Sequence, residues 1–280
     1  MMKRIYYFSL LFLIFASCKQ TKQSDINEDA KAKFIALNVQ YAKTYEYEFR
    51  FGEVDTTSGF LIELVEFNKN GNPIRREKYH RSKYLKEYDE INIYSYDSEN
   101  KLSETIRQND SGVIKSIVRE KYDNNQNTER VFYNNDGVLT GKASYKYDKD
   151  GNCIELISYD ESGKIKYKTS SKYGANNKLI EQKQFDNKGK IESSFKVLEN
   201  KDGSAETHYY DENNELKYKS IYIFGENKLV KSLEWIDIKD DNSSKTEYKY
   251  DENNLLIEET EYENNGEPKS IEKTVYIKFQ

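Results

Sequence analysis

One turn-like segment has the oxygen-rich spacing of a calcium loop. Residues 148–152 read Asp-Lys-Asp-Gly-Asn, so side-chain oxygens recur at alternate positions. An EF-hand loop that begins at Asp148 needs a glutamate at its twelfth position, where Tyr159 stands instead. The segment is also in register with turns that lack such ligands. We therefore predict a structural turn and no metal site, with calcium binding as the alternative.

The other side chains that could carry chemistry are few. His80 and His208 lie far apart, with no Cys or His at metal-ligand spacing, which favours exposed or hydrogen-bonded histidines. Cys153 follows Gly-Asn at a predicted strand start, where a small buried thiol is a better interpretation than a nucleophile. Carboxylates are abundant, but no pair stands out as an acid and a base. We predict no cofactor and no enzymatic activity, with a hydrolase as the alternative.

The aromatic content is unusual, with 25 Tyr and 13 Phe but only 1 Trp. Trp235 precedes an irregular turn, where it is either a core anchor or a ring platform for a sugar. Tyrosine is enriched at binding surfaces, so tyrosines that lie off the repeat described below are candidates for one. The candidate ligand-binding residues are Tyr167, Tyr218, Tyr222, Trp235 and Tyr248.

The N-terminal segment predicts export. A basic start is followed by an apolar run over residues 5–15 and then by small residues, as in a secretion signal. The run is about half of the ~20 residues that a membrane-spanning helix needs. Residues 15–18, Phe-Ala-Ser-Cys, resemble the lipobox of bacterial lipoproteins, with Phe15 where leucine is usual. The resemblance implies cleavage after residue 17 and lipidation of Cys18; a buried thiol or half a disulfide is the alternative.

The lipid anchor defines the predicted location and partners. Several acyl chains on Cys18 would hold the chain firmly on a membrane, since each buried CH₂ contributes roughly 0.8 kcal/mol. We expect a periplasmic or surface-exposed protein of the cell envelope, with the outer membrane favoured over the inner. Removal of residues 1–17 leaves 42 basic and 49 acidic residues, a net charge of −7, which argues against nucleic acid. The further partner is an unknown protein or glycan.

Aromatic residues before turn-like Asp, Asn and Gly clusters recur about every 26 residues. The first series, with Leu198 at its missing place, is Tyr96, Tyr122, Tyr147, Tyr173, Phe224 and Tyr250. The second series, with Ile236 in its gap and Gln108 one period upstream, is Tyr133, Tyr159, Phe185, Tyr210 and Tyr262. Because the two series interleave, each repeat unit holds two strands and two turns.

An aliphatic residue follows each aromatic by six or seven positions and can pair with it across the turn. The predicted pairs are Tyr147–Ile154, Tyr159–Ile165, Tyr173–Ile180, Phe185–Ile191, Tyr210–Leu216 and Phe224–Val230. Glycines in the turns supply positive φ, and an Asp or Asn after the aromatic can bond the turn backbone. Between turns, residues 165–173 alternate an aromatic face with a cationic or neutral-polar one. We expect the Tyr and Ile face to turn inward.

Two neighbouring turns carry a family resemblance. Residues 147–152, Tyr-Asp-Lys-Asp-Gly-Asn, and residues 159–165, Tyr-Asp-Glu-Ser-Gly-Lys-Ile, resemble the YD repeat of RHS-type proteins. Weaker copies begin at Tyr96, Tyr122, Phe185, Tyr210 and Tyr250. The resemblance spans roughly residues 60–280 and implies consecutive β-hairpins in a curled sheet. Together with the lipobox, the repeats also resemble lipoproteins of the Bacteroidota.

These observations predict an all-β protein. Residues 1–17 are the signal peptide, residues 18–37 a lipidated tether with a possible short helix, and residues 38–280 the hairpin-repeat domain. Some 17 strands are too many for a flat sheet, so we expect a long curled antiparallel meander, single-layer or spiral. The predicted function is an exported lipoprotein with a non-catalytic binding or scaffolding surface. A carbohydrate-binding lipoprotein and an antitoxin or immunity-like repeat protein are further alternatives.

Overall fold

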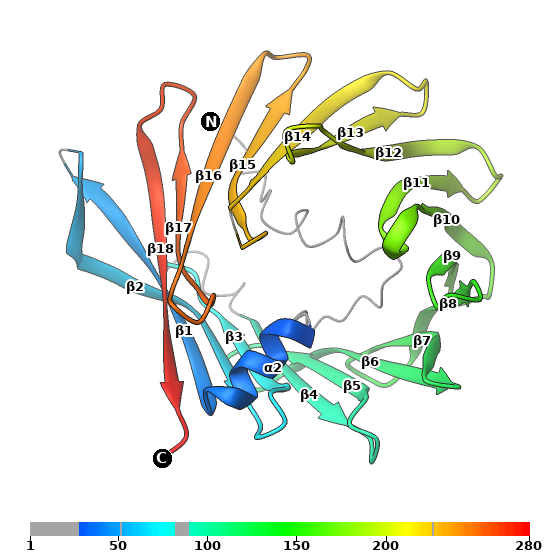
Figure 1. The fold of residues 1–280 in the computed structure, drawn as a ribbon. Helices are drawn as coiled ribbons and strands as arrows, with labels where there is room; N and C mark the ends of the chain where they lie inside the picture. Colours follow the sequence, from blue (N-terminus) through cyan, green and yellow to red (C-terminus); the bar gives the residue numbers. More distant parts are fainter. Residues whose placement is uncertain (1–27, 51, 82–89, 226) are drawn as a thin grey trace.

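The computed structural model describes residues 28–50, 52–81, 90–225 and 227–280 (Figure 1). The signal peptide, Cys18 and residues 19–27 lie outside the described residues, so their predicted roles stay predictions. Within the described part the chain forms the helix α2 (Glu28–Ala36), the short 3-10 helix η2 (Ala175–Asn177) and eighteen strands. The short helix that the sequence indicates near the domain start is therefore present.

The strands follow one another along the chain. The first nine are β1 (Val39–Arg50), β2 (Glu53–Phe67), β3 (Pro73–Lys78), β4 (Glu90–Tyr96), β5 (Leu102–Gln108), β6 (Ile114–Asp123), β7 (Gln126–Asn134), β8 (Leu139–Tyr147) and β9 (Cys153–Asp160). The other nine are β10 (Ile165–Tyr173), β11 (Leu179–Asp186), β12 (Ile191–Glu199), β13 (Ala205–Asp211), β14 (Leu216–Phe224), β15 (Val230–Asp237), β16 (Asn242–Tyr250), β17 (Leu256–Tyr262) and β18 (Pro268–Lys278).

The sheet closes into a barrel (Figure 1). Each strand pairs antiparallel with its neighbours in sequence, and β1 also pairs with β18 between Val39 and Tyr47. The predicted all-β antiparallel meander is confirmed in this coarse form. The structure differs in detail from the predicted open sheet, whether a single layer or a spiral. The β1–β18 pairing joins the two ends of the sheet and leaves no open edge there.

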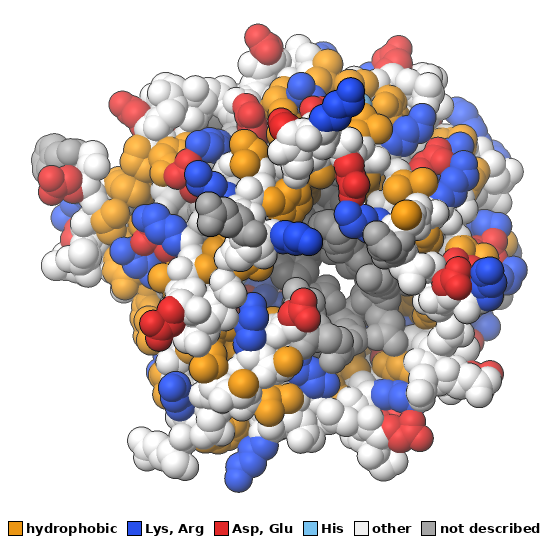
Figure 2. All heavy atoms as spheres, in the orientation of Figure 1, with side chains coloured by type: hydrophobic (Ala, Val, Ile, Leu, Met, Phe, Trp, Pro, Cys, Tyr) orange, Lys and Arg blue, Asp and Glu red, His pale blue; other side chains and the backbone are white. Residues whose placement is uncertain are grey.

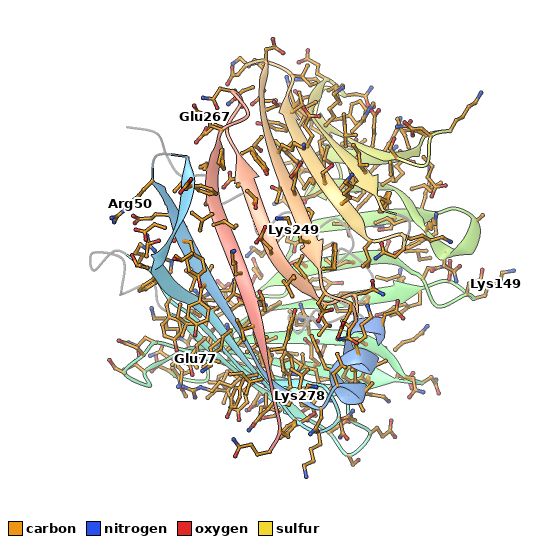
Figure 3. All side chains as sticks on the ribbon, turned by 60° about the vertical axis from the view of Figure 1, so that its left-hand side comes forward. Arg50, Glu77, Lys149, Lys249, Glu267 and Lys278 are labelled. Atoms are coloured by element: carbon orange, nitrogen blue, oxygen red, sulfur yellow. The ribbon has the colours of Figure 1, made fainter. Side chains whose placement is uncertain are left out.

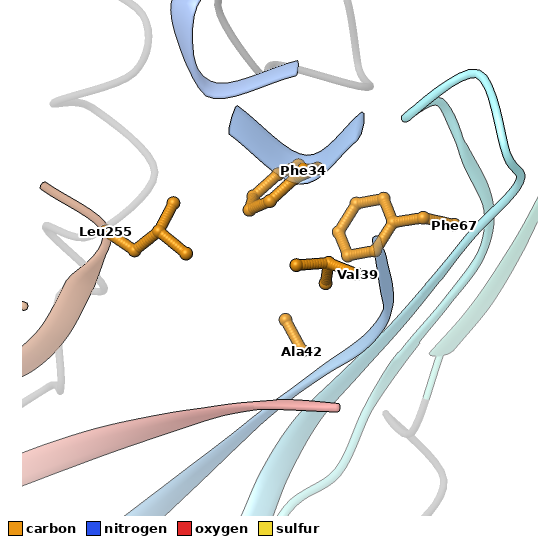
Figure 4. Close-up of a cluster of buried hydrophobic side chains, with 5 residues drawn as sticks. All are labelled: Phe34, Val39, Ala42, Phe67 and Leu255. Carbon is orange, nitrogen blue, oxygen red and sulfur yellow. The ribbon is translucent and has the colours of Figure 1, made fainter. Parts of the chain in front are cut away.

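The helix α2 lies inside the ring of strands at one end of the barrel (Figure 1). The ring centroid of Phe34 lies 4.7 Å from that of Phe67 and 5.9 Å from that of Tyr276. Figure 4 shows the buried cluster beneath the helix, which is Phe34, Val39, Ala42, Phe67 and Leu255. We call the sheet face that carries Phe67 and Tyr276 the inward face, and the opposite face the outward face.

The aromatic–aliphatic pairs have a uniform spacing of six residues. The predicted pairs Tyr159–Ile165, Phe185–Ile191, Tyr210–Leu216 and Phe224–Val230 are confirmed. The two pairs predicted with a spacing of seven are wrong by one residue, because Tyr147 pairs with Cys153 and Tyr173 with Leu179. The register shifts at each of these pairs, as in a β-bulge, so the residue after the partner falls out of the ladder.

The first aromatic series ties neighbouring strands together through its hydroxyls. The Tyr147 hydroxyl donates to the Asn127 carbonyl at 2.8 Å, and the Tyr173 hydroxyl donates to the Cys153 carbonyl at 2.9 Å. Burial raises the pKa of both tyrosines to about 12. Tyr276 extends the series by one period and donates to the carbonyl of Leu256. These tyrosines therefore serve the architecture of the barrel.

The second aromatic series lies on the outward face, so the prediction that it faces inward is wrong. A cation stands over each of four of its rings, 5.2 to 5.8 Å from the ring centroid. The pairs are Arg119 over Tyr133, Lys142 over Tyr159, Lys196 over Tyr210 and Lys245 over Tyr262. Cation–π contacts at exposed sites are worth about 0.5–1 kcal/mol each, which explains how these rings are stabilised on the outward face.

The turn chemistry predicted from the sequence is confirmed. The Asp160 carboxylate accepts the backbone N–H groups of Ser162 and Lys164, both at 2.9 Å, and Gly163 has a φ of 82°. Asn214 and Asn254 replace glycine in equivalent turns, with φ of 63° and 60°. Asparagine tolerates this left-handed region better than most residues, so the departures from the glycine pattern keep the turn geometry.

The capping carboxylates have a measurable effect on stability. Asp186→Ala should lower the free energy of unfolding by about 1 kcal/mol, since the backbone N–H groups of Lys188 and Lys190 lose their acceptor. Chemical denaturation measures the change. Asn187→Ala is the matched control, because Asn187 is exposed and makes no hydrogen bond within the described chain. Equal losses in the two variants would contradict the capping role.

Candidate functional site

The outward face is a lattice of ion pairs. Glu155 of β9 lies 2.7 Å from the ammonium of Lys146 on β8 and also contacts that of Lys168 on β10. Hydrogen bonds from these two lysines lower the pKa of Glu155. Glu129 and Glu258 are each held in the same way by lysines on both neighbouring strands. Figure 2 shows basic and acidic side chains side by side over much of the visible surface.

These glutamates recur with the period of the repeat, a signal that the sequence analysis missed. The paired positions on the odd-numbered strands from β5 to β17, with Ser232 at the equivalent place on β15, are Glu104, Glu129, Glu155, Glu181, Glu206 and Glu258. Glu206 pairs with His208 at 2.8 Å, which confirms the prediction of a hydrogen-bonded histidine there. The period-26 glutamate therefore marks the outward face from β5 to β17.

The inward face of β13–β16 is rich in hydroxyls, with Asp211 and Asp237 at strand ends. Direct cross-strand partners lie on the same face of the sheet, so the inward face can be followed from Tyr276 on β18. Glu272 lies on the same face as Tyr276, its partner on β17 is Glu259, and the partner of Glu259 on β16 is Tyr248. The same register gives the inward positions of β15, β14 and β13. On these three strands and β16 the inward positions include Thr207, Tyr209, Tyr218, Ser220, Tyr222, Leu233, Trp235, Thr246 and Tyr248. The described inward positions of β13–β16 hold no lysine, arginine or histidine.

An aromatic cluster lies at the centre of this region. The Trp235 ring centroid lies 5.0 Å from that of Tyr209 and 5.6 Å from that of Tyr218. Ser220 is the direct cross-strand partner of Trp235, and Tyr222 lies two positions further along the same strand. We call Tyr209, Tyr218, Ser220, Tyr222 and Trp235 the aromatic–hydroxyl patch.

Three hydroxyls of the patch are buried and make no hydrogen bond of standard geometry among the described residues, although Ser220 lies close enough to Tyr209 and Tyr222 to counteract part of the rise in their pKa. They belong to Tyr209, Ser220 and Tyr222. Ser220 is 0% exposed and Tyr222 is 6% exposed. Burial raises the pKa of both tyrosines, so both hydroxyls stay protonated at neutral pH. A buried hydroxyl without a partner costs about 1–3 kcal/mol, so these groups could gain from a ligand that supplies one.

The structure brings together four of the five predicted ligand-binding residues. Tyr218, Tyr222, Trp235 and Tyr248 occupy inward positions of the consecutive strands β14, β15 and β16. Tyr167 also faces inward but lies on β10, where it packs beside Cys153 and Leu156. Tyr209 and Ser220 were not among the candidates predicted from the sequence, because Tyr210 was expected inward and alternation with it placed Tyr209 outward.

Inward-facing carboxyls are stacked across the seam where the barrel closes. Glu272 of β18 is the direct partner of Glu46 on β1 and of Glu259 on β17. Burial, with a contribution from Glu63, raises the pKa of Glu259 to about 7. Burial, together with Glu259, Glu46, Glu63 and Glu261, raises the pKa of Glu272 to about 8. We call Glu46, Glu259 and Glu272 the acidic ladder.

A buried ion pair lies elsewhere on the inward face. The Arg130 guanidinium on β7 lies 2.6 Å from the Glu120 carboxylate on β6, and the Glu120 side chain is 2% exposed. The side-chain amide of Asn127 donates to the same carboxylate at 2.5 Å. The inward face thus carries ionisable groups near this pair and at the acidic ladder, whereas the mid-strand inward positions of β13–β16 are uncharged.

The remaining candidates of the sequence analysis have structural roles. The Asp148 carboxylate accepts the backbone N–H groups of Asp150 and Asn152 at 2.9 Å each, as in the other turns. Cys153 is fully buried beside Leu156, as predicted, but it is disulfide-bonded, so its interpretation as a buried thiol is wrong. The described residues include no group of three or more His, Cys, Asp or Glu placed to hold a metal ion. Across the same residues, we find no helix of the length and apolarity that a membrane crossing requires.

No protein-family model and no curated protein matches the chain. Among solved structures, a porin-like protein from Bacteroides uniformis ATCC 8492 is similar with a TM-score of 0.48 and 9% identity, over 86% of this chain and 97% of that one. A porin-like protein from Bacteroides vulgatus ATCC 8482 has a TM-score of 0.31 and 8% identity, over 86% and 99%. The TcdB2-TccC3-TEV structure has a TM-score of 0.36 and 11% identity, over 82% of this chain and 14% of that one.

Proposed function

We propose that this chain is an exported, lipid-anchored protein of the cell envelope, with the outer membrane favoured over the inner. Its barrel stands in water, periplasmic or surface-exposed, and acts as a non-catalytic binding protein through its inward face. One observation carries the proposal: the outward face is a lattice of ion pairs, while the inward face of β13–β16 is aromatic, uncharged at its mid-strand positions and incompletely hydrogen-bonded.

The outward charges support a barrel that stands in water. A lipid-facing lysine or arginine costs about 2–4 kcal/mol at the middle of a bilayer. Here lysines stand at mid-strand positions around the barrel, such as Lys142, Lys168 and Lys245, with 40–50% of each side chain exposed. Figure 3 turns the face that carries Lys249 toward the reader, with Glu267 and Lys278 at opposite ends of β18. In this proposal the membrane attachment comes from the lipid on Cys18.

The titration of the inward carboxyls supports a non-catalytic role. A glycoside hydrolase needs two carboxyls whose surroundings move their pKa values apart, so that one is an acid and the other a base. Burial moves the pKa of Glu259 and that of Glu272 in the same direction, to about 7 and about 8. This neighbouring pair therefore does not provide the required division of roles.

The anchor is tested by separating membranes from soluble protein. Cys18→Ala should move the chain from the membrane fraction to the soluble fraction and remove the mass of the acyl chains, because no other attachment is proposed. Thr21→Ala is the matched control, since Thr21 lies close to Cys18 in the sequence and carries no predicted lipid. Membrane retention of the Cys18→Ala chain, or release of the Thr21→Ala chain, would contradict the proposal.

A further inference from the structure

The aromatic–hydroxyl patch has a composition that selects one class of ligand. The rings of Tyr209 and Tyr218 each lie within 6 Å of the Trp235 ring, and all three provide flat apolar surfaces. The buried hydroxyls of Tyr209, Ser220 and Tyr222 can donate or accept and make no hydrogen bond of standard geometry among the described residues. A suitable ligand therefore combines apolar ring faces with several hydroxyls.

We propose that the aromatic–hydroxyl patch binds a neutral saccharide. This inference rests on the proposed function, since it assigns a ligand class to the inward binding face. The C–H face of a sugar ring packs on the rings of Trp235 and Tyr218. Because the hydroxyls of Tyr209, Ser220 and Tyr222 are buried, these side chains turn toward the ligand to complete their hydrogen bonds with its hydroxyls. A sugar hydroxyl both donates and accepts, as each of the three protein hydroxyls does, so the two sets can pair without an unpaired group.

The charges around the patch exclude the main competing ligands. A phosphate or carboxylate ligand would call for a lysine or arginine, and the described inward positions of β13–β16 hold neither. The nearest charged positions are acidic: Asp237 is the cross-strand partner of Tyr218, and Glu259 is the partner of Tyr248. Anionic ligands would therefore be repelled, whereas a neutral sugar would not.

Trp235 makes the site directly observable, because it is the only tryptophan in the chain. The full chain, in a detergent without a sugar headgroup, is titrated with maltohexaose, cellohexaose and xylohexaose while tryptophan emission is recorded. Inorganic phosphate and hexagalacturonate are the anionic comparison probes, and a neutral hexapeptide is the non-sugar probe. We expect a saturable change in emission with at least one neutral hexasaccharide and none with the anionic probes.

A pair of adjacent tyrosines provides the matched variants. Tyr209→Phe removes one inward hydroxyl that makes no hydrogen bond of standard geometry among the described residues, and should weaken the binding of the hexasaccharide about 5- to 10-fold. Tyr210→Phe removes an outward hydroxyl from the neighbouring position and should change the affinity less than twofold. Ser220→Ala, a second small change within the patch, should resemble Tyr209→Phe.

The possible results test the saccharide assignment separately from the proposed binding function of the inward face. No saturable change with any neutral hexasaccharide, or equal affinities for the Tyr209→Phe and Tyr210→Phe proteins, would overturn the saccharide assignment. If the hexapeptide binds instead and Tyr209→Phe weakens that binding, the saccharide is wrong but the inward binding face stands. If neither Tyr209→Phe nor Ser220→Ala changes the affinity for any probe, both the saccharide assignment and the proposed binding function are wrong.

Discussion

Arg130→Met should lower the free energy of unfolding by about 3–5 kcal/mol, because it leaves the carboxylate of Glu120 buried without its cation. The Asn127 amide still donates to this carboxylate, but one neutral donor does not replace the charge. Urea denaturation followed by circular dichroism measures the loss. The effect should be among the largest for a single substitution in the described barrel wall.

The matched control is the outward pair Arg119–Glu104, whose side chains are 55% and 26% exposed. Arg119→Met should cost no more than about 1 kcal/mol from the ion pair itself, since water already screens these charges. Replacing both Arg130 and Glu120 by apolar residues should recover much of the loss, because no charge is then left buried. Similar losses in Arg130→Met and Arg119→Met would contradict the different burial of the two pairs.

The free energy of unfolding should fall as the pH rises from about 4.5 to about 8. Glu259 and Glu272 hold their protons to a pKa of about 7 and about 8 in the folded barrel, against an ordinary value of 4.5. Between these limits the folded state binds more protons than the unfolded state, so raising the pH favours unfolding. Each unit of pKa difference corresponds to about 1.4 kcal/mol, so the loss should be on the order of several kcal/mol.

Two variants test whether the acidic ladder causes this slope. Glu272→Gln should reduce the decrease in the free energy of unfolding above pH 5 and raise the urea midpoint at pH 8. The reason is that it removes a charge facing Glu46 and Glu259. Glu258→Gln is the control: Lys249 and Lys273 outweigh burial and lower the pKa of Glu258. That outward group contributes stability that is lost as the pH falls, so its variant should be less stable near neutral pH. A slope unchanged by Glu272→Gln would contradict the ladder.

Local chemistry made the repeat predictable from sequence. The capping Asp160 and the positive φ of Gly163 depend on residues within one turn, and they determine where each hairpin bends. The closure of the sheet was not predictable in this way. The β1–β18 pairing joins Tyr47 to Ile271, and no local pattern specifies a contact over such a separation.

The two faces of the sheet were harder to assign, for a physical reason. A one-residue slip moves every following side chain to the opposite face. The bulge beside Tyr159 introduces such a slip between β9 and β10, and the same irregularity recurs at many turns. Alternation counted across a turn therefore fails, which is why Tyr159 and Tyr210 were expected inward. Within one strand the count holds, as with Tyr218 and Tyr222.

The aromatic–hydroxyl patch depends on both kinds of information. Tyr218 and Trp235 were candidates from residue type alone, but their contact follows from the register of β14 against β15. Ser220 carries no signal in the sequence. Its importance comes from complete burial beside Trp235 without a hydrogen bond of standard geometry in the described structure.

The most direct test of a lipid-anchored barrel that stands in water is cysteine labelling at adjacent positions. Ser170→Cys, in a Cys153→Ala background, places a thiol on the outward face opposite Glu155, and Thr169→Cys places one on the inward face. In isolated membranes opened by sonication, a water-soluble maleimide should label the Ser170→Cys protein as fast as it does in detergent, and the buried Thr169→Cys protein more slowly. Protection of the Ser170→Cys thiol in membranes, relieved only by detergent, would contradict the account.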